Sequence, residues 1–393
     1  MLAKEIEKYK SVYSHGLIND TIPFWQNKSP DHEFGGFMTI LDADGTVVST
    51  DKPMWIMGRV TWLFSRLYNA VEKKNEWLAL AKHGIDFIRK YGFDKDGRMY
   101  YLVTRDGRPL RKRRYLFTET FGVIAMAEYA KATNDEQAKQ EAISLYKLIL
   151  RYHTTPGLLE PKMYPQTRQL KSHAMPMILL AMTQVLRQID DDPLYEQVIN
   201  NSISEIRDDF LKPEFKALLE NVGPNGEFVD QPAGRSINPG HAIETAWFIM
   251  EEARYRNNDK SLIDLALQIL DWSLDIGWDN EFGGIFYFRD CKGYPCLEYE
   301  HDMKLWWPHI EAIYATLLAY YLTNDEQYAK WHAKVHSWSY AHFPDKKNGE
   351  WFGYLHRDGT LSSTIKGNCW KGPFHLPRMQ LNCWKLLEEM SKT

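Results

Sequence analysis

The chain has 393 residues, of which 44% are hydrophobic and 25% are charged, and both values are typical of globular proteins. Its formal net charge of −4 offers no basic field and argues against binding to nucleic acid. The charged start and the lack of a long uninterrupted apolar run predict neither a signal peptide nor a membrane span. The few, irregularly spaced cysteines suit a reducing cytoplasm better than a disulfide scaffold.

One turn motif recurs along the chain. The sequence EFGGF at residues 33–37 is echoed by EFGGI at 281–285. Related turns with glycine and an aromatic or apolar residue lie at residues 96–100, 156–158, 225–228 and 349–352. Each predicts a short hairpin or an extended loop.

After each turn the sequence predicts an apolar helix. Prolines mark most of the starts, where the missing N–H group has no partner within a helix. The predicted helices cover residues 55–70, 117–130, 173–188, 241–254, 306–322 and 375–390. More polar, amphipathic helices are expected between them, for example over residues 259–276.

The helix entries also repeat, since TNDEQ at residues 133–137 recurs at 323–327 and predicts an N-cap followed by acidic residues. Six inner and six outer helices predict an all-α protein, an (α/α)6 barrel with short β-hairpins or loops at one end. An open solenoid of helix pairs is the alternative, but the chain ends show no dedicated polar caps. No linker interrupts the pattern, so residues 1–393 are expected to form a single domain.

Polar residues in the first turns of parallel inner helices would converge at one end of the lumen, near the positive helix dipoles. Glu311 is the most informative, because it is the only carboxylate in the apolar run 306–322. His241 and Glu244 lie one turn apart at another helix start. The further candidates are Arg59, Glu119, His173, His309, His375 and Arg378.

Two histidines on separate helices suit acid and base roles, and Arg59 would stabilise an oxyanion. A metal site of His241, Glu244 and His375 is an alternative, but no HExxH pattern is present and we expect no metal. Glycoside hydrolysis by Glu244 and Glu311 is a second alternative, which leaves the histidines and Arg59 without a role. A barrel that binds a sugar or a protein without catalysis is the non-enzymatic alternative.

These motifs make the chain resemble the N-acylglucosamine 2-epimerase family, which also contains the cellobiose 2-epimerases. The resemblance runs from Phe24-Trp25 and the first EFGG turn to FHLPR at residues 374–378. It implies an (α/α)6 barrel that interconverts aldoses epimeric at C2 by removing and returning a proton. It also implies an essential arginine, a base and an acid, two supporting carboxylates and sugar-contacting tryptophans, which are Arg59, His241, His375, Glu244, Glu311, Trp247 and Trp307. Trp306, Glu119, His173 and Arg378 are further predicted sugar-binding residues.

The motifs at residues 238–241, 304–309 and 374–378 look more like the N-acylglucosamine branch than the disaccharide branch. We therefore predict interconversion of N-acetylglucosamine and N-acetylmannosamine through an enediolate, with mannose, glucose or cellobiose-type disaccharides as alternative substrates. His173 departs from the pattern of that branch and leaves substrate choice open. No cofactor is expected, and regulation by ATP cannot be read from a chain without a GxxxxGK[ST] loop. A homodimer would fit the family.

Overall fold

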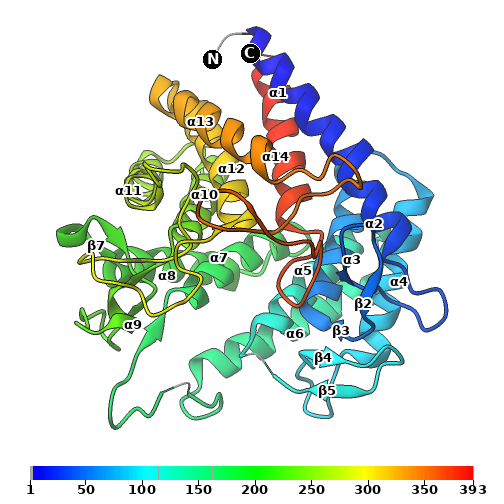
Figure 1. Cartoon of the computed structure of the whole chain (residues 1–393). Coiled ribbons are helices and arrows are strands. Elements are labelled where there is room, and N and C mark those ends of the chain that lie inside the picture. The colour runs from blue at the N-terminus through cyan, green and yellow to red at the C-terminus, as the bar shows by residue number, and fades with distance from the viewer. Residues whose placement is uncertain (1–2, 114, 162, 393) are drawn as a thin grey trace.

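A ring of six inner helices forms the centre of the protein (Figure 1). The computed structural model describes residues 3–113, 115–161 and 163–392. Successive inner helices pack side by side from the first to the last. They are α3 (Met54–Ala70), α5 (Phe117–Thr133), α7 (Ala174–Leu186), α10 (Pro239–Tyr255), α12 (Trp306–Thr323) and α14 (His375–Met390).

The ring closes between the last inner helix and the first. Phe374, the residue before α14, lies edge-on against Trp62 of α3, with 5.1 Å between the ring centroids. Leu381 of α14 belongs to the same buried apolar cluster as the core residues of α3 and α5. An open solenoid would leave its two end helices apart, so the predicted (α/α)6 barrel is confirmed.

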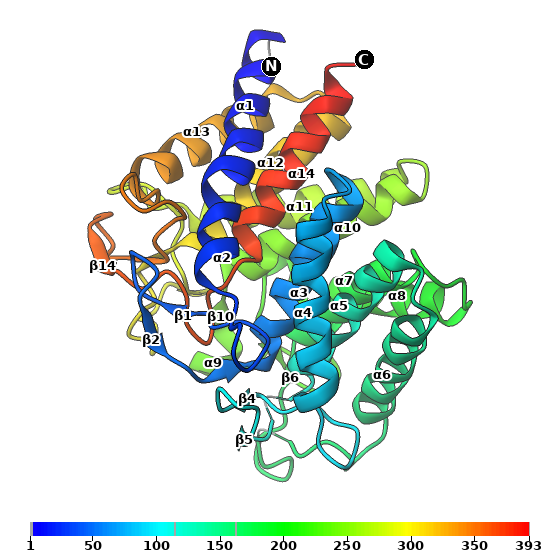
Figure 2. The same cartoon turned by 90° about the vertical axis from the view of Figure 1, so that its right-hand side faces the viewer.

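An outer layer of helices covers the ring. Outer helices α4, α6, α8, α11, α13 and α1 pack on α3, α5, α7, α10, α12 and α14 respectively. Their bounds are α1 (Ala3–His15), α4 (Asn75–Tyr91), α6 (Glu136–Thr154), α8 (Leu194–Glu205), α11 (Lys260–Gly277) and α13 (Glu326–His342). Figures 1 and 2 both show α1, in blue, running alongside α14, in red, so the two ends of the chain meet in the barrel wall. Every helix in the described ranges is too short or too polar to span a bilayer.

The repeated TNDEQ sequence ends an inner helix and begins an outer one. Asn134 and Asn324 adopt left-handed backbone conformations with φ of 57° and 55°, which close α5 and α12. The next residues cap the outer helices, because Asp135 accepts from the N–H of Ala138 and Asp325 from that of Gln327. The predicted N-caps are therefore confirmed.

Short antiparallel strands gather at the end of the barrel where the inner helices begin. β3, β6, β10 and β12 each end at or within one residue of an inner helix, and they pair with β4, β9, β11 and β13. The strands are β1 (Ile40–Leu41), β2 (Val47–Ser49), β3 (Lys52–Pro53), β4 (Leu102–Val103), β5 (Pro109–Arg111), β6 (Lys171–Ser172), β7 (Leu211–Lys212), β8 (Ala217–Leu218), β9 (Asn221–Val222), β10 (Ser236–Ile237), β11 (Arg289–Asp290), β12 (Lys304–Leu305), β13 (Tyr354–Leu355) and β14 (Leu361–Ser363). The remaining short helical segments are η1 (Gly16–Thr21), α2 (Ile22–Lys28), η2 (Ile206–Phe210), η3 (Pro213–Phe215) and α9 (Pro232–Arg235).

The two EFGG turns are anchored in the same way. Asp31, just before the first turn, accepts from the buried Lys52 Nζ at 2.8 Å and from Arg105 Nε at 2.9 Å. Asp279 lies just before the second turn in the same way. It accepts hydrogen bonds from Lys304 Nζ at 3.0 Å and from Arg357 Nε at 2.9 Å. Because each lysine lies in the strand that leads into an inner helix, these buried ion pairs fix the starts of α3 and α12.

Candidate active site

A cavity of about 1520 Å³ occupies the lumen of the barrel. At the starts of the inner helices its wall includes Arg59, His241, Glu244, His375 and Arg378. The three predicted tryptophans Trp247, Trp306 and Trp307 line it as well. Most of the residues predicted from the sequence therefore line one cavity, although they come from four different helices.

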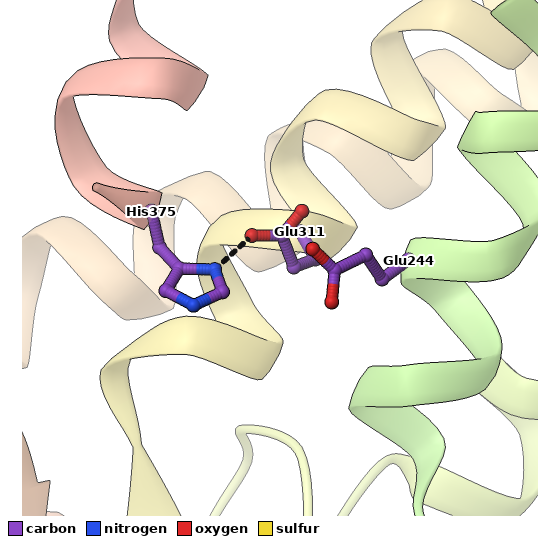
Figure 3. Close-up of side chains that lie close together, drawn as sticks. All are labelled: Glu244, Glu311 and His375. Atoms are coloured by element: carbon purple, nitrogen blue, oxygen red, sulfur yellow. Dashed lines mark hydrogen bonds and ion pairs between the residues drawn. The ribbon is translucent and has the colours of Figure 1, made fainter. Parts of the chain in front are cut away.

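His375, which lines the cavity, forms a short hydrogen bond with Glu311, whose carboxylate lies outside the cavity lining. His375 is the first residue of α14, and its Nδ1 lies 2.6 Å from Oε1 of Glu311 on α12 (Figure 3). Trp247 Nε1 donates to the other oxygen of Glu311 at 2.7 Å. An ionised carboxylate only accepts, so Nδ1 of a neutral His375 carries the proton and its Nε2 keeps a lone pair.

Arg378 joins the carboxylates of two neighbouring helices. Its Nη2 donates to Oε1 of Glu311 at 2.8 Å and to Oε1 of Glu244 on α10. Within the described residues, Glu244, Glu311 and His375 are the one group whose donor atoms lie close enough to hold a metal ion. The guanidinium already supplies positive charge to both carboxylates, so this donor set does not fit an additional divalent cation. That no metal is needed stays a prediction.

His241 has a partner that the sequence analysis missed. Its Nδ1 lies 3.1 and 3.0 Å from the two oxygens of Glu220, in the segment between β8 and β9. The neighbour expected from helical spacing, Glu244, instead bonds to Arg378 across the lumen. Glu220 carried one usable signal, since it is the only charged residue in the apolar stretch 217–222.

The two imidazoles have opposite electrostatic environments. Burial lowers the pKa of His375 well below its usual value; the charge of Glu244 opposes this shift, and the charges of Arg378 and Arg59 add to it. Burial also acts to lower the pKa of His241, but the carboxylate of Glu220 outweighs it and raises that pKa. At neutral pH His375 is therefore poised as a base, and His241 is the imidazole that more readily carries a proton.

Trp307 brings the two imidazoles to one place. Its indole is close to both, with ring centroids 5.0 Å from His241 and 5.8 Å from His375. Trp306 meets His375 edge-on at 6.1 Å. Both imidazoles also line the cavity, so two acid–base groups from different helices face one hollow beside an aromatic wall.

Arg59 lies at the same end of the cavity among aromatic rings. Its guanidinium carbon is 4.1 Å from the ring centroid of Phe121 and 4.9 Å from those of Trp55 and Phe374. Its Nη1 donates to the carbonyl of Trp370 at 3.2 Å, whereas its buried Nε has no hydrogen-bond partner. Burial lowers the pKa of Arg59 to about 9, so the group stays charged at neutral pH and retains donors for a bound anion.

Besides Glu311, whose carboxylate bonds the cavity-lining His375, Trp247 and Arg378, three candidates do not line the cavity. Glu119 accepts at Oε1 from Arg98 Nε at 2.5 Å and from the N–H of Met99 at 3.0 Å, and so holds the hairpin before α5. His309 is fully buried, bonding the Leu305 carbonyl and the Ile285 N–H. His173 bonds Thr245 Oγ1 at 3.0 Å behind Glu220. Each lies in or next to a helix's first turn but bonds neighbouring protein groups instead of facing the lumen.

The fold and the site define this protein as an (α/α)6-barrel enzyme equipped for acid–base chemistry. The model of the family N-acylglucosamine 2-epimerase (GlcNAc 2-epimerase) matches residues 35–375. The chain is 34% identical over 386 residues to the N-acylglucosamine 2-epimerase of Bos taurus, covering 95% of this chain and 90% of that relative. The protein belongs to the N-acylglucosamine 2-epimerase family, as the sequence motifs predicted.

More distant relatives agree with this placement. The cellobiose 2-epimerase of Dictyoglomus turgidum is 26% identical over 401 residues, covering 97% of this chain and 99% of that protein. The solved cellobiose 2-epimerase of Spirochaeta thermophila superposes with a TM-score of 0.86 over 99% of both chains at 20% identity, which establishes the shared fold. The predicted class of carbohydrate isomerase is thereby confirmed.

Proposed function

We propose that this protein interconverts N-acetylglucosamine and N-acetylmannosamine by moving the proton on C2. The observation that carries the proposal is the pair of imidazoles against Trp307, each with its Nδ1 on a carboxylate. Both Nε2 atoms are then available to a substrate in the cavity. The identity of 34% to a relative named N-acylglucosamine 2-epimerase supports the choice of sugar.

In this mechanism the bound sugar opens to its aldehyde form. One imidazole removes the C2 proton, and the charge of the resulting enediolate develops on O1. Arg59, whose guanidinium lines the cavity and donates one hydrogen bond to the Trp370 carbonyl, stabilises that oxyanion. The second imidazole then protonates C2 from the opposite face, which inverts the carbon. For one epimer His375 is the base and His241 the acid, and for the other epimer the roles are exchanged.

The chemistry requires no redox step, because the proton lost from C2 is replaced by another proton. We therefore propose a cofactor-independent enzyme. The four cysteines are free thiols in the structure, which supports a reducing, cytoplasmic location. Fractionation of the source cells would test that location, and light scattering on the purified protein would test the expected homodimer.

Proton NMR in deuterated water tests the function directly. Purified protein given N-acetylmannosamine should form N-acetylglucosamine that carries deuterium at C2. Inversion with no solvent label would exclude the proposed proton transfer. The same assay with N-acetylglucosamine, mannose, glucose and cellobiose ranks the alternative sugars by kcat/KM, and release of a reducing sugar from an oligosaccharide would indicate a glycosidase instead.

A further inference from the structure

Glu220 is held rigidly, although it lies in the irregular segment between β8 and β9. Its backbone N–H donates to the carbonyl of Ser236 at 2.9 Å, and its own carbonyl accepts from the N–H of His173 at 3.0 Å. The adjoining strands β6 and β9 pair Ser172 with Asn221. The backbone of Glu220 is thus tied to the segments that lead into α7 and α10.

The carboxylate of Glu220 lies between two imidazoles. On the cavity side, His241 Nδ1 is within 3.1 Å of both oxygens. On the other side, His173 Nδ1 lies 3.8 Å from Oε1, while the Nε2 of that ring meets Thr245 Oγ1 at 3.0 Å. His173 is only 1% exposed and lies outside the lining of the cavity, so it supports Glu220 from behind.

We infer that Glu220 is a positioning residue that holds His241 in the Nδ1-protonated tautomer and aims its Nε2 at the substrate. The inference rests on the proposed function and adds to it a carboxylate for the second imidazole. Glu311 stands in the same relation to His375, with Nδ1 to oxygen at 2.6 Å. Each imidazole therefore has its own carboxylate, supplied by a different element from the one that carries the ring.

The charges around His241 indicate what the loss of Glu220 would change. Glu220 faces the ring from the β8–β9 segment, Glu244 lies on the same helix, and His375 of α14 is near the same Trp307. Burial acts to raise the pKa of Glu220, but the His241 charge and the bonds from both imidazoles lower it to about 2. Glu220 is therefore ionised at neutral pH, and removing its charge lowers the pKa of His241.

The test compares Glu220→Gln and Glu220→Asp with the wild type in deuterated water. Glu220→Gln keeps the size of the side chain but loses the charge, so kcat for epimerisation should fall about 100-fold, with a smaller change in KM. Its pH profile should shift, with the limb that reports His241 moving to lower pH. Glu220→Asp retains the charge, so that limb should stay near its wild-type position even where the shorter side chain reduces the rate.

Proton exchange without inversion gives a second readout. His375 and its carboxylate are intact in Glu220→Gln, so the epimer deprotonated by His375 should still exchange its C2 hydrogen with solvent while inversion is slow. Glu214→Gln, an exposed carboxylate of the short helix η3 that precedes β8, is the matched control and should behave as wild type. A wild-type kcat and an unshifted pH profile in Glu220→Gln would overturn the role of Glu220 but leave the proposed epimerase function intact. A wild-type enzyme that inverts C2 without solvent label would instead overturn the proposed function.

Discussion

Nδ1 of His375 and Oε1 of Glu311 lie 2.6 Å apart, although the two residues are separated by 64 positions in the chain. The first turn of α14 and the second turn of α12 bring them together near the start of the lumen. Trp247 and Arg378 bond the same carboxylate, so its orientation is fixed from two further directions. The base of the proposed reaction is therefore set in place before any sugar arrives.

Glu311→Gln should lower kcat about 100-fold and leave KM within a few-fold of wild type. The amide still accepts one hydrogen bond, but it carries no charge to orient His375 and to partner Arg378. The buried Arg378 retains Glu244, so we expect a loss of about 1 to 3 kcal/mol in the free energy of unfolding. Initial rates by NMR and urea titration measure the two effects.

Glu388→Gln is the matched control for this change, because Glu388 lies on α14 and pairs with Lys385 on a partly exposed surface. Its kcat and unfolding free energy should both stay close to the wild-type values. A wild-type kcat in Glu311→Gln would show that the carboxylate does not orient His375.

Arg59→Lys tests whether enediolate formation depends on the guanidinium. A lysine keeps the charge but cannot present the planar set of donors that lies among Trp55, Phe121 and Phe374. Losing such a donor to an oxyanion reduces kcat by about 100- to 1000-fold. Both inversion and exchange of the C2 hydrogen should fall, since both pass through the enediolate.

This joint loss distinguishes Arg59→Lys from Glu220→Gln, for which exchange should survive. Arg207→Lys, on the exposed surface beside Asp208, is the control and should retain both rates. Exchange at the wild-type rate in Arg59→Lys would remove Arg59 from the mechanism.

The helices could be read from the sequence because their signals are local. Proline near the first turn, aspartate at the N-cap and asparagine at the end of an inner helix each act within a few residues. The internal repeat then supplied the number of helices and their alternation. Convergence of the first turns followed from the closed ring, and this is why His241, Glu244 and His375 were found together.

The hydrogen-bond partners could not be read in this way. Glu220 reaches His241 only because β6 pairs with β9 and its N–H bonds to Ser236, and neither contact leaves a local pattern. Glu119 was predicted to face the lumen because it lies in the first turn of α5. It bonds Arg98 of the preceding hairpin instead. Helical spacing identifies the face on which a side chain lies, but the neighbouring loops decide which group it bonds.

The protein should lose stability as the pH falls below about 6.5, because several buried histidines must stay neutral. Burial lowers the pKa of His309, His332 and His336 to about 3, 4 and 3, and that of His375 well below its usual value. Histidine in an unfolded chain titrates near 6.5, so the unfolded state binds more protons in the window between these values. Each such proton removes about 1.4 kcal/mol of stability per pH unit. His241, whose pKa is raised, acts in the opposite direction.

Urea titrations between about pH 7.5 and about pH 5 measure this slope. His332→Gln should reduce it by about one proton, because one of these buried groups no longer titrates. His356→Gln, at an exposed position, should leave the slope unchanged. Equal slopes for wild type and His332→Gln would show that this imidazole is not held neutral by the fold.

Lys304→Met should destabilise the protein by about 3 kcal/mol, because it removes a buried cation from the buried carboxylate of Asp279. The double variant Lys304→Met/Asp279→Asn should recover part of that loss, because it also removes the buried carboxylate that keeps only the partly exposed Arg357 as a cationic partner. Lys292→Met is the control: its pair with Asp230 is shorter, at 2.6 Å, but partly exposed, so about 1 kcal/mol at most is expected. Because Lys304 leads into α12, which carries Trp307 and Glu311, Lys304→Met should also raise KM. If Lys304→Met and Lys292→Met lost the same unfolding free energy, the buried Lys304–Asp279 pair would not fix the start of α12.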